Sequence, residues 1–446
     1  GIIMKVSLDK ENRFLKDGKV DLKQAFIYTG IKAAWCYKKG DTTPETIRET
    51  SESTLLRMGI ETYLNDHGTP DEHYQISVEI TGIPKLLCMI LNDEHQYSTC
   101  ERSLRYTKVI ENEYISKEEV EKYNKWLKIC AQILEEKYMD FFLKTTPNEK
   151  EAHRALKKIA QENARQQISV MTPTSISYST PRYQWQKIAS CLLDMCANPN
   201  NPWKKMAAPY ALDLVNQLVD LNVVVTTEEV LKLLDSLNVV APSEEVLKLY
   251  NKLQEELKND RKYLYKNNKQ TKLSLFAEDN PFSGINKPND FGASINYNTH
   301  LSISAFAQEE RHRTVYNEIL LPETFMYSTP DIIKGTAFEE EWAKDMKSGA
   351  LTYPQGQMIK VNMITSLQKI IQFMGKERAC DRAQQEIENW YVNVFLPEVI
   401  AGLEKRKEYQ EEAKYLEENY LNRCRCAYPD YACPNPCGHP RVRRPF

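Results

Sequence analysis

The spacing of hydrophobic residues in the first half of the chain predicts helices around one strand. Residues 74–81 alternate polar and apolar side chains, which is typical of a half-buried strand. Ser116 precedes Glu119 by three residues, as in a capping box, at the start of a long amphipathic pattern. The predicted helices, in which apolar residues return every three or four positions, cover residues 23–37, 53–63, 116–138 and 148–167.

The second half repeats this outline more loosely. Residues 294–306 are strand-like, and residues 363–372 and 383–414 have helical spacing. The fold class that we predict is therefore α+β, with two units that each combine one sheet and several long helices. A length of 446 residues is typical of two or three domains.

A short internal repeat lies between the two halves. Residues 221–234 recur as residues 237–250, and in each copy a Thr or Ser precedes Glu-Glu and an apolar helical pattern. We expect a helical connector here; a partner-binding repeat is the alternative, although a solenoid needs about three units. The predicted domains are residues 1–220, the connector 221–265, residues 266–420 and a Cys/Pro-rich tail over 421–446.

Composition changes this picture little. The chain is 27% charged and 41% hydrophobic with a net charge of -3, so its charge gives no reason to expect a nucleic acid or an anionic membrane as partner. The apolar run at the N-terminus is too short for a signal peptide, and no apolar stretch reaches about 18 residues. We predict a cytoplasmic protein, whose seven scattered cysteines are small core residues.

Four further cysteines gather in the tail. Cys424, Cys426, Cys433 and Cys437 fall within 14 residues, and His439 follows them. Four thiolates at this distance are enough to enclose a tetrahedral Zn²⁺, and so short a Pro-rich segment needs a staple to be ordered. Metal-free thiols in a flexible tail are the alternative, because the spacing is not that of a standard zinc knuckle.

A polar segment over residues 93–106 contains Ser98, Glu101, Ser103 and Arg105. Hydroxyl groups and a guanidinium are the residue types that hold a nucleotide monophosphate, because they donate several hydrogen bonds to phosphate oxygens. The structural alternative is a polar helix cap with an i,i+4 pair between Glu101 and Arg105.

In the second half the basic triplet Arg311-His312-Arg313 is followed by Asn317-Glu318. Laid end to end, the two segments resemble the signature of the flavin-dependent thymidylate synthases, in which Arg-His-Arg is followed by a serine, Asn-Glu and Ser-x-Arg-Tyr. Residues 67–73 are similar to that family's His-x-(Ser/Thr)-Pro-Phe-Glu-His segment, with Asp71 in place of Phe. Residues 162–165 resemble its Glu-x-Ala-Arg motif, and residues 361–387 resemble its Asn, Ser-Leu and Arg-Ala-x-x-x-Ala-Gln-x-Glu-Ile stretch.

This resemblance implies two tandem copies of the family's sheet-plus-long-helices domain. It implies FAD as cofactor and methylation of dUMP to dTMP, with methylenetetrahydrofolate and NADPH as co-substrates. The implied substrate-binding residues are Ser98, Glu101, Ser103, Arg105, Arg165 and Arg378. The implied cofactor-binding residues are His73, Arg311, His312, Arg313, Asn317, Glu318 and Asn362.

Neither half carries the complete signature. Asp93, Glu94 and His95 stand where the first half would need Arg-His-Arg, and anions there would repel a flavin diphosphate. Residues 319–325 of the second half contain no Ser-x-Arg. The two losses are reciprocal, so we expect composite active sites shared between the repeats and a homodimer that forms a pseudo-tetramer. The alternatives are a non-catalytic nucleotide- or flavin-binding scaffold, or a relative that transfers a different one-carbon group.

Overall fold

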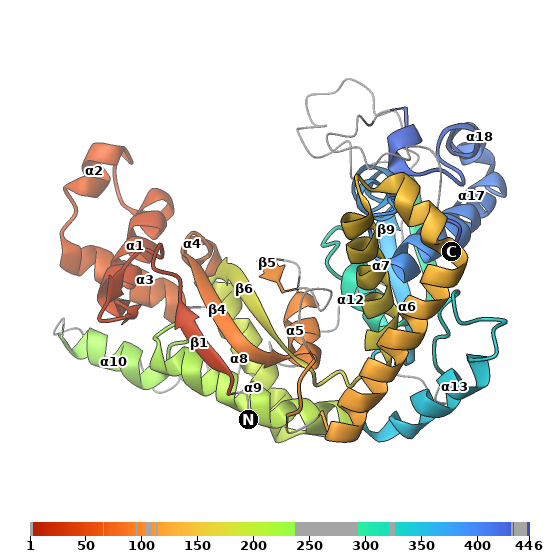
Figure 1. Ribbon diagram of the computed structural model, residues 1–446. Coiled ribbons are helices and arrows are strands. Elements are labelled where there is room, and N and C mark those ends of the chain that lie inside the picture. Colours follow the sequence, from red (N-terminus) through yellow and green to blue (C-terminus); the bar gives the residue numbers. More distant parts are fainter. Residues whose placement is uncertain are drawn as a thin grey trace. The chain divides into compact units, whose positions relative to one another are not determined.

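The computed structural model describes residues 3–65, 67–94, 96–102, 109–112, 115–236, 293–320, 326–429, 431 and 444–446 (Figure 1). The chain divides into two compact units, and each combines two stretches of sequence. The first unit consists of residues 1–102 and 173–263, and the second of residues 103–172 and 264–446. We describe each unit by itself.

The first unit is built on a four-stranded antiparallel sheet with the strand order β1-β4-β6-β5. The strands are β1 (Lys5–Leu8), β4 (Gln75–Pro84), β5 (Ser98–Glu101) and β6 (Pro173–Pro181). The strand predicted over residues 74–81 is thus confirmed as β4. Its alternation places Ile76, Val78 and Ile80 in the core. A short hairpin, β2 (Leu15–Lys16) with β3 (Lys19–Val20), lies outside this sheet.

Helices complete the first unit. Helices α1 (Leu22–Tyr37) and α3 (Glu52–Leu64) confirm two predictions and approach each other at glycines. A Cβ atom on Gly30 would lie 1.8 Å from the carbonyl oxygen of Leu55, and one on Gly59 would lie 2.0 Å from that of Phe26. Only glycine allows this contact. The other helices among the described residues of this unit are α2 (Pro44–Arg48), α4 (Gly68–Glu72), α5 (Lys85–Asn92), α8 (Arg182–Ala197), α9 (Pro202–Asp220) and α10 (Thr227–Ser236).

The second unit contains a three-stranded antiparallel sheet with the order β7-β9-β8. The strands are β7 (Ser294–Ser302), β8 (Tyr316–Leu320) and β9 (Met358–Ser366). The strand predicted over residues 294–306 ends early, because the Ser302 side chain accepts a hydrogen bond from the N–H of Ala305 at 3.0 Å and caps α12 (Ile303–Glu309).

Two helix predictions in this unit need correction. Residues 363–366 belong to β9, whose alternating buried residues include Val361 and Met363, and helical structure begins only at α14 (Leu367–Lys369). The long helix predicted over residues 383–414 is a series of shorter elements joined by π-helical and 3-10 turns. These elements are α16 (Gln385–Trp390), η6 (Tyr391–Phe395), α17 (Leu396–Glu404), η7 (Lys407–Tyr409) and α18 (Gln410–Asn419).

Two long helices from the first half of the sequence pack in the second unit. Helices α6 (Lys117–Thr145) and α7 (Glu149–Ala164) are confirmed where the pattern predicted them, and they lie beside each other in Figure 1. The ring of Trp126 on α6 lies 5.0 Å from that of Trp342 on α13 (Glu339–Ser348), measured between ring centres. The Trp126 indole N–H also donates to the Asp345 carboxylate at 2.8 Å.

The compact units therefore do not follow the predicted borders. Residues 103–172 fall inside the predicted domain 1–220, but they form one compact unit with residues 264–446. The tandem duplication itself stays a prediction. Of the predicted connector, α10 is described, whereas the second copy at residues 237–250 lies outside the described residues.

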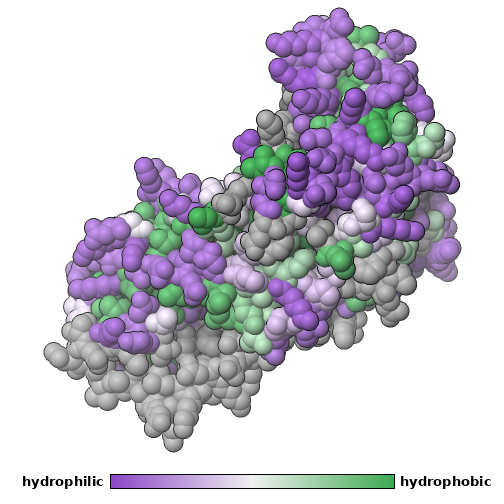
Figure 2. Space-filling model, turned by 60° about the horizontal axis from the view of Figure 1, so that its bottom comes forward, coloured by the Kyte–Doolittle hydropathy of each residue, from purple (hydrophilic) through white to green (hydrophobic). Residues whose placement is uncertain are grey.

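The described surface is mostly polar. On the face drawn in Figure 2, hydrophilic residues predominate and hydrophobic areas are small, as expected for a chain that is 27% charged. Among the described residues, no helix combines the length and the apolar character needed to span a membrane.

Candidate functional site

The Arg-His-Arg triplet lies in the turn that connects α12 to β8. Two backbone hydrogen bonds fix this turn: the N–H of His312 donates to the Glu309 carbonyl at 3.0 Å, and the N–H of Val315 donates to the His312 carbonyl at 3.0 Å. His312 is only 5% exposed, while Arg311 is half-buried and Arg313 is exposed. The turn thus buries the imidazole and leaves the two guanidinium groups nearer to solvent.

Arg378 contacts this buried histidine. Its Nε donates to Nε2 of His312 at 2.8 Å, and its Nη2 donates to the carbonyl oxygen of Gln308 at 2.9 Å. An arginine Nε can only donate, so Nε2 of His312 carries a lone pair and the proton of the neutral ring is on Nδ1. Arg378 lies on α15 (Gly375–Arg378) with its side chain 12% exposed, so one edge of the guanidinium can meet a ligand.

The electrostatics of the pair favour this neutral histidine. Burial lowers the pKa of His312 well below its ordinary value of 6.5, and the positive charges of Arg378 and Arg311 lower it further. Burial also lowers the pKa of Arg378, although the carboxylates of Glu377 and Glu309 oppose that shift. The site therefore keeps arginine cations around an uncharged imidazole.

The predicted cofactor residues of the sheet fall on different faces. Glu318 of β8 stands opposite Asn362 of β9, so these two side chains share one face of the sheet. Asn317 stands opposite Met363 and points to the other face. Within the described part of the chain, the Oδ1 atoms of Asn317 and Asn362 are buried without a hydrogen-bond partner.

The Glu-x-Ala-Arg motif meets the second half's Gln-Gln-Glu-Ile segment inside the second unit. The Glu162 carboxylate accepts from the backbone N–H of Gln385 at 3.2 Å. The Asn163 side chain donates to the Gln385 side-chain oxygen at 3.2 Å. Arg165 is 5% exposed, and its charge acts on Glu386, whose pKa is raised by burial and held down in part by Ser302 and Arg165.

In the first unit, Ser98 and Glu101 lie on the edge strand β5. The Glu101 carboxylate forms an ion pair with Nζ of Lys85 at 2.8 Å, and both side chains are largely buried. Because residues 98–101 form a strand, the alternative of a polar helix cap is wrong for these residues. Ser98 is exposed, and Ser103 and Arg105 lie outside the described residues.

The segment 67–73 contains the short helix α4, with His73 exposed at its C-terminal end. Asp71 is 2% exposed and accepts from Nε of Arg182 at 2.9 Å and from the Thr29 hydroxyl at 3.1 Å. Sequence reasoning missed Arg182, as it missed Gln308 and Gln385. The available signal was Asp71, a charged residue where the family's segment has Phe. A buried carboxylate requires a cationic partner, so this position indicated that one exists.

Of the predicted zinc ligands, the structure describes Cys424, which is buried, and Cys426, which is half-buried; Cys433 and Cys437 lie outside the described residues. The ligand atoms of Cys424, Asp381 and Glu388 lie within 4.8 Å of one another. The Arg444 guanidinium, however, pairs with the Glu388 carboxylate. A cation is therefore already present at this group of acids, and the four-cysteine zinc site stays a prediction.

The site lies in an α+β fold and places arginine side chains around a neutral histidine. Guanidinium groups in this arrangement are suited to bind an anionic ligand. The family model described as "Thymidylate synthase complementing protein" matches residues 27–202. The resemblance to the flavin-dependent thymidylate synthases is thus confirmed over this segment, which includes β5 and the Glu-x-Ala-Arg motif. No curated protein matches the chain.

The chain is similar to two solved structures. A thymidylate synthase X from Helicobacter pylori, determined with FAD and dUMP, is 17% identical, covers 55% of this chain and 100% of that chain, and has a TM-score of 0.27. A UMP/dUMP methylase PolB from Streptomyces cacaoi, bound with 5-Br dUMP, is 11% identical, covers 42% of this chain and 77% of that chain, and has a TM-score of 0.22.

Proposed function

We propose that this chain is an FAD-dependent enzyme of the thymidylate synthase type that methylates dUMP to dTMP, with methylenetetrahydrofolate and NADPH as co-substrates. One observation supports this most directly. The second unit joins the Glu-x-Ala-Arg segment, which belongs to the family-matched part of the chain, to Gln385, seven residues after Arg378. Arg378 in turn contacts the Arg-His-Arg turn.

The residues present fit a flavin dinucleotide. Arg311 and Arg313 offer guanidinium groups for its diphosphate, and the buried Oδ1 of Asn362 is an acceptor that lacks a partner among the described residues. When bound, FAD would supply the electron transfer between NADPH and the one-carbon unit. The chain's own part is to bind, orient and exclude water.

Arg378 is the residue that we assign to the pyrimidine. Gln308 and His312 fix its guanidinium through Nη2 and Nε, so the group is oriented before any ligand arrives. A fixed positive charge beside a uracil carbonyl stabilises negative charge that develops on the ring. Loss of one such charged hydrogen bond costs about 1.5–3 kcal/mol.

We further propose that the active sites are composite and that two chains form a pseudo-tetramer. Ser98, Ser103 and Arg105 would bind the nucleotide phosphate, and the second unit would contribute Arg378 and the Arg-His-Arg turn. The reciprocal loss of motifs in the two halves supports this division.

A non-catalytic scaffold is the second candidate. It is favoured by the acids Asp93 and Glu94, which stand where the first half would need cations, and by the ion pair that occupies Glu101. A different transferred one-carbon group is a variant of the enzyme proposal, and identification of the pyrimidine product by mass spectrometry distinguishes the two.

The experiment that tests flavin binding is equilibrium titration of the full chain with FAD, followed by flavin fluorescence. Replacement of Arg311 and Arg313 by Ala should weaken binding about tenfold or more, because two charged contacts to the diphosphate are lost. Arg423→Ala is the matched control, since Arg423, like Arg313, is an exposed arginine of the second unit. Equal affinity of all three proteins would argue against the assignment.

A further inference from the structure

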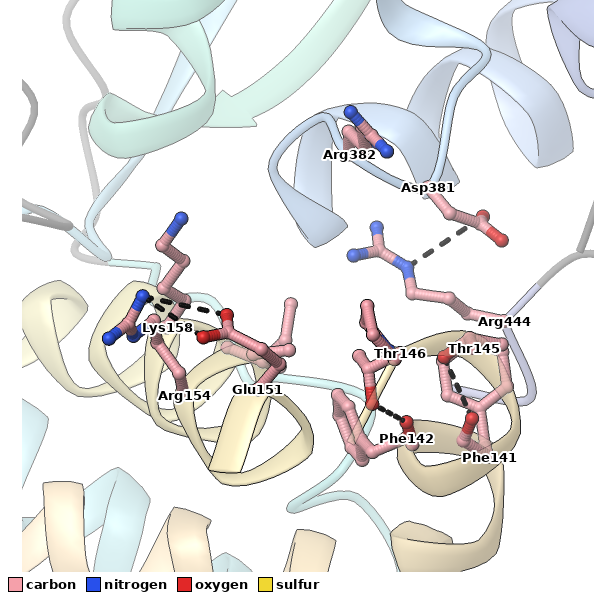
Figure 3. A pocket seen from close by; sticks show the side chains of 13 residues that line it. Phe141, Phe142, Thr145, Thr146, Glu151, Arg154, Lys158, Asp381, Arg382 and Arg444 are labelled. Carbon is pink, nitrogen blue, oxygen red and sulfur yellow. Dashed lines mark hydrogen bonds and ion pairs between the residues drawn. The ribbon is translucent and has the colours of Figure 1, made fainter. Parts of the chain in front are cut away.

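A pocket of about 450 Å³ lies in the second unit, and the proposed function does not use it. Its walls come from the end of α6, the first turns of α7, residues 381–382 and Arg444 (Figure 3). This volume is within the range of sites that hold small molecules, roughly 300–1,000 Å³.

Positive charge dominates the polar lining. Four basic residues, Arg154, Lys158, Arg382 and Arg444, face the pocket together with only two acids, Glu151 and Asp381. Arg154 forms an exposed pair with Glu151 at 3.2 Å, which contributes little energy in water. A ligand anion can therefore recruit Arg154 at small cost.

The Arg444 side chain is an independent indication that the pocket binds a ligand. Its side chain is 3% exposed and is held by Glu388 and, at 3.8 Å from Nε, by Asp381. Within the described part of the chain, its Nη1 is buried without a hydrogen-bond partner. A buried guanidinium nitrogen without an acceptor is costly, and an anion in the pocket would satisfy it.

The other side of the pocket is aromatic. Phe141 and Phe142 line it, and the ring of Phe142 stacks on that of Phe446 at 5.7 Å between centres. The hydroxyls of Thr145 and Thr146 donate to the carbonyls of Phe141 and Phe142 at 2.8 and 2.6 Å. These hydroxyls are thus engaged with the α6 backbone, so the polar contacts left for a ligand come from the basic side chains (Figure 3).

We propose that this pocket binds a small dianion carried on an aromatic ring, either an aryl phosphate or an aromatic dicarboxylate. The anionic groups would contact Arg154, Lys158 and Arg444, and the ring would pack on Phe141 and Phe142. This site does not depend on the thymidylate synthase proposal.

Isothermal titration calorimetry of the full chain tests the proposal. The probes are phenyl phosphate, phthalate, inorganic phosphate and benzyl alcohol. We expect phenyl phosphate or phthalate to bind at least about tenfold more tightly than both inorganic phosphate and benzyl alcohol, because only the aryl anions use both walls. The aryl probe that binds more tightly shows whether the anionic group of the ligand is a phosphate or a pair of carboxylates.

Two variants localise the binding. Arg154→Ala and Lys158→Ala should each weaken the aryl anion about fivefold or more, and added salt should weaken it further. Lys157→Ala is the control, because Lys157 is an exposed lysine of the same helix that does not line the pocket. Absence of binding, equal binding of inorganic phosphate, or an equal effect of Lys157→Ala would overturn the proposal.

Discussion

Replacement of Arg378 by Met tests the central contact of the site. Methionine replaces the aliphatic part of the arginine side chain and has no donor, so the change removes the bonds to His312 Nε2 at 2.8 Å and to the Gln308 carbonyl at 2.9 Å. Each acceptor that is left buried costs about 1–3 kcal/mol. Release of a desolvated charge offsets part of this loss. We expect a net loss of about 2–4 kcal/mol in the free energy of unfolding.

The same variant should raise the pKa of His312. Burial is the largest cause of the lowered pKa and persists in the variant, while the charge of Arg378 is the second cause and is removed. The pKa should therefore move up and stay below 6.5. An NMR titration of the seven histidines, with the His312 signal assigned through His312→Gln, measures the shift.

The lowered pKa of His312 also makes the stability of the protein depend on pH. With its pKa lowered in the folded state, His312 binds fewer protons there than in the unfolded chain, so its contribution is lost as the pH falls below about 6.5. The slope is at most about 1.4 kcal/mol per pH unit for one group. In Arg378→Met this acid loss should be smaller. An unchanged His312 pKa, or the same shift in the control Arg423→Met, would refute the reasoning.

The remaining predictions concern buried polar pairs and close packing. Asp71→Phe alone should destabilise the protein by about 3–5 kcal/mol because it leaves Arg182 buried without its carboxylate, and Arg182→Met added to it should restore much of this loss in chemical unfolding. Glu162→Gln should lower the rate of dUMP-dependent flavin reduction about tenfold or more, with FAD affinity unchanged, because the segment that joins the two motifs loses a charged acceptor. Gly59→Ala should cost about 1–3 kcal/mol, whereas Gly402→Ala, whose Cβ meets no atom within 4 Å, should be neutral or stabilising in thermal unfolding.

Local patterns in the sequence predicted the elements that local interactions determine. The long amphipathic pattern of α6 and its cap are confirmed, since the Ser116 hydroxyl accepts from the N–H of Glu119 at 3.2 Å. Part of strand β9 was predicted as helix, because a short apolar run fits both the helical period and the strand period. Pairing with the neighbouring strands determines which structure forms. The π-helical turn at residues 391–395 was missed for a related reason: apolar spacing does not distinguish it from an α-helix.

Contacts between distant residues were beyond a single sequence. Nothing local indicates that Asn163 of α7 contacts Gln385, because the two residues lie 222 positions apart in the sequence. Arg378 and His312 were both predicted as site residues from the resemblance, but their direct contact joins positions 66 residues apart. Asp71 and Arg182 lie 111 residues apart, so the sequence showed a carboxylate at an unusual position without showing its partner.

The measurement that tests the proposed function most directly is anaerobic reduction of FAD bound to the full chain, started with NADPH and followed by the loss of the oxidised flavin absorbance. The proposal predicts faster bleaching when dUMP is present, and loss of this acceleration in Arg378→Met with FAD still bound. A chain that binds FAD and is reduced at the same rate with and without dUMP, or that binds no FAD after reconstitution, would contradict the enzyme proposal and favour the non-catalytic scaffold.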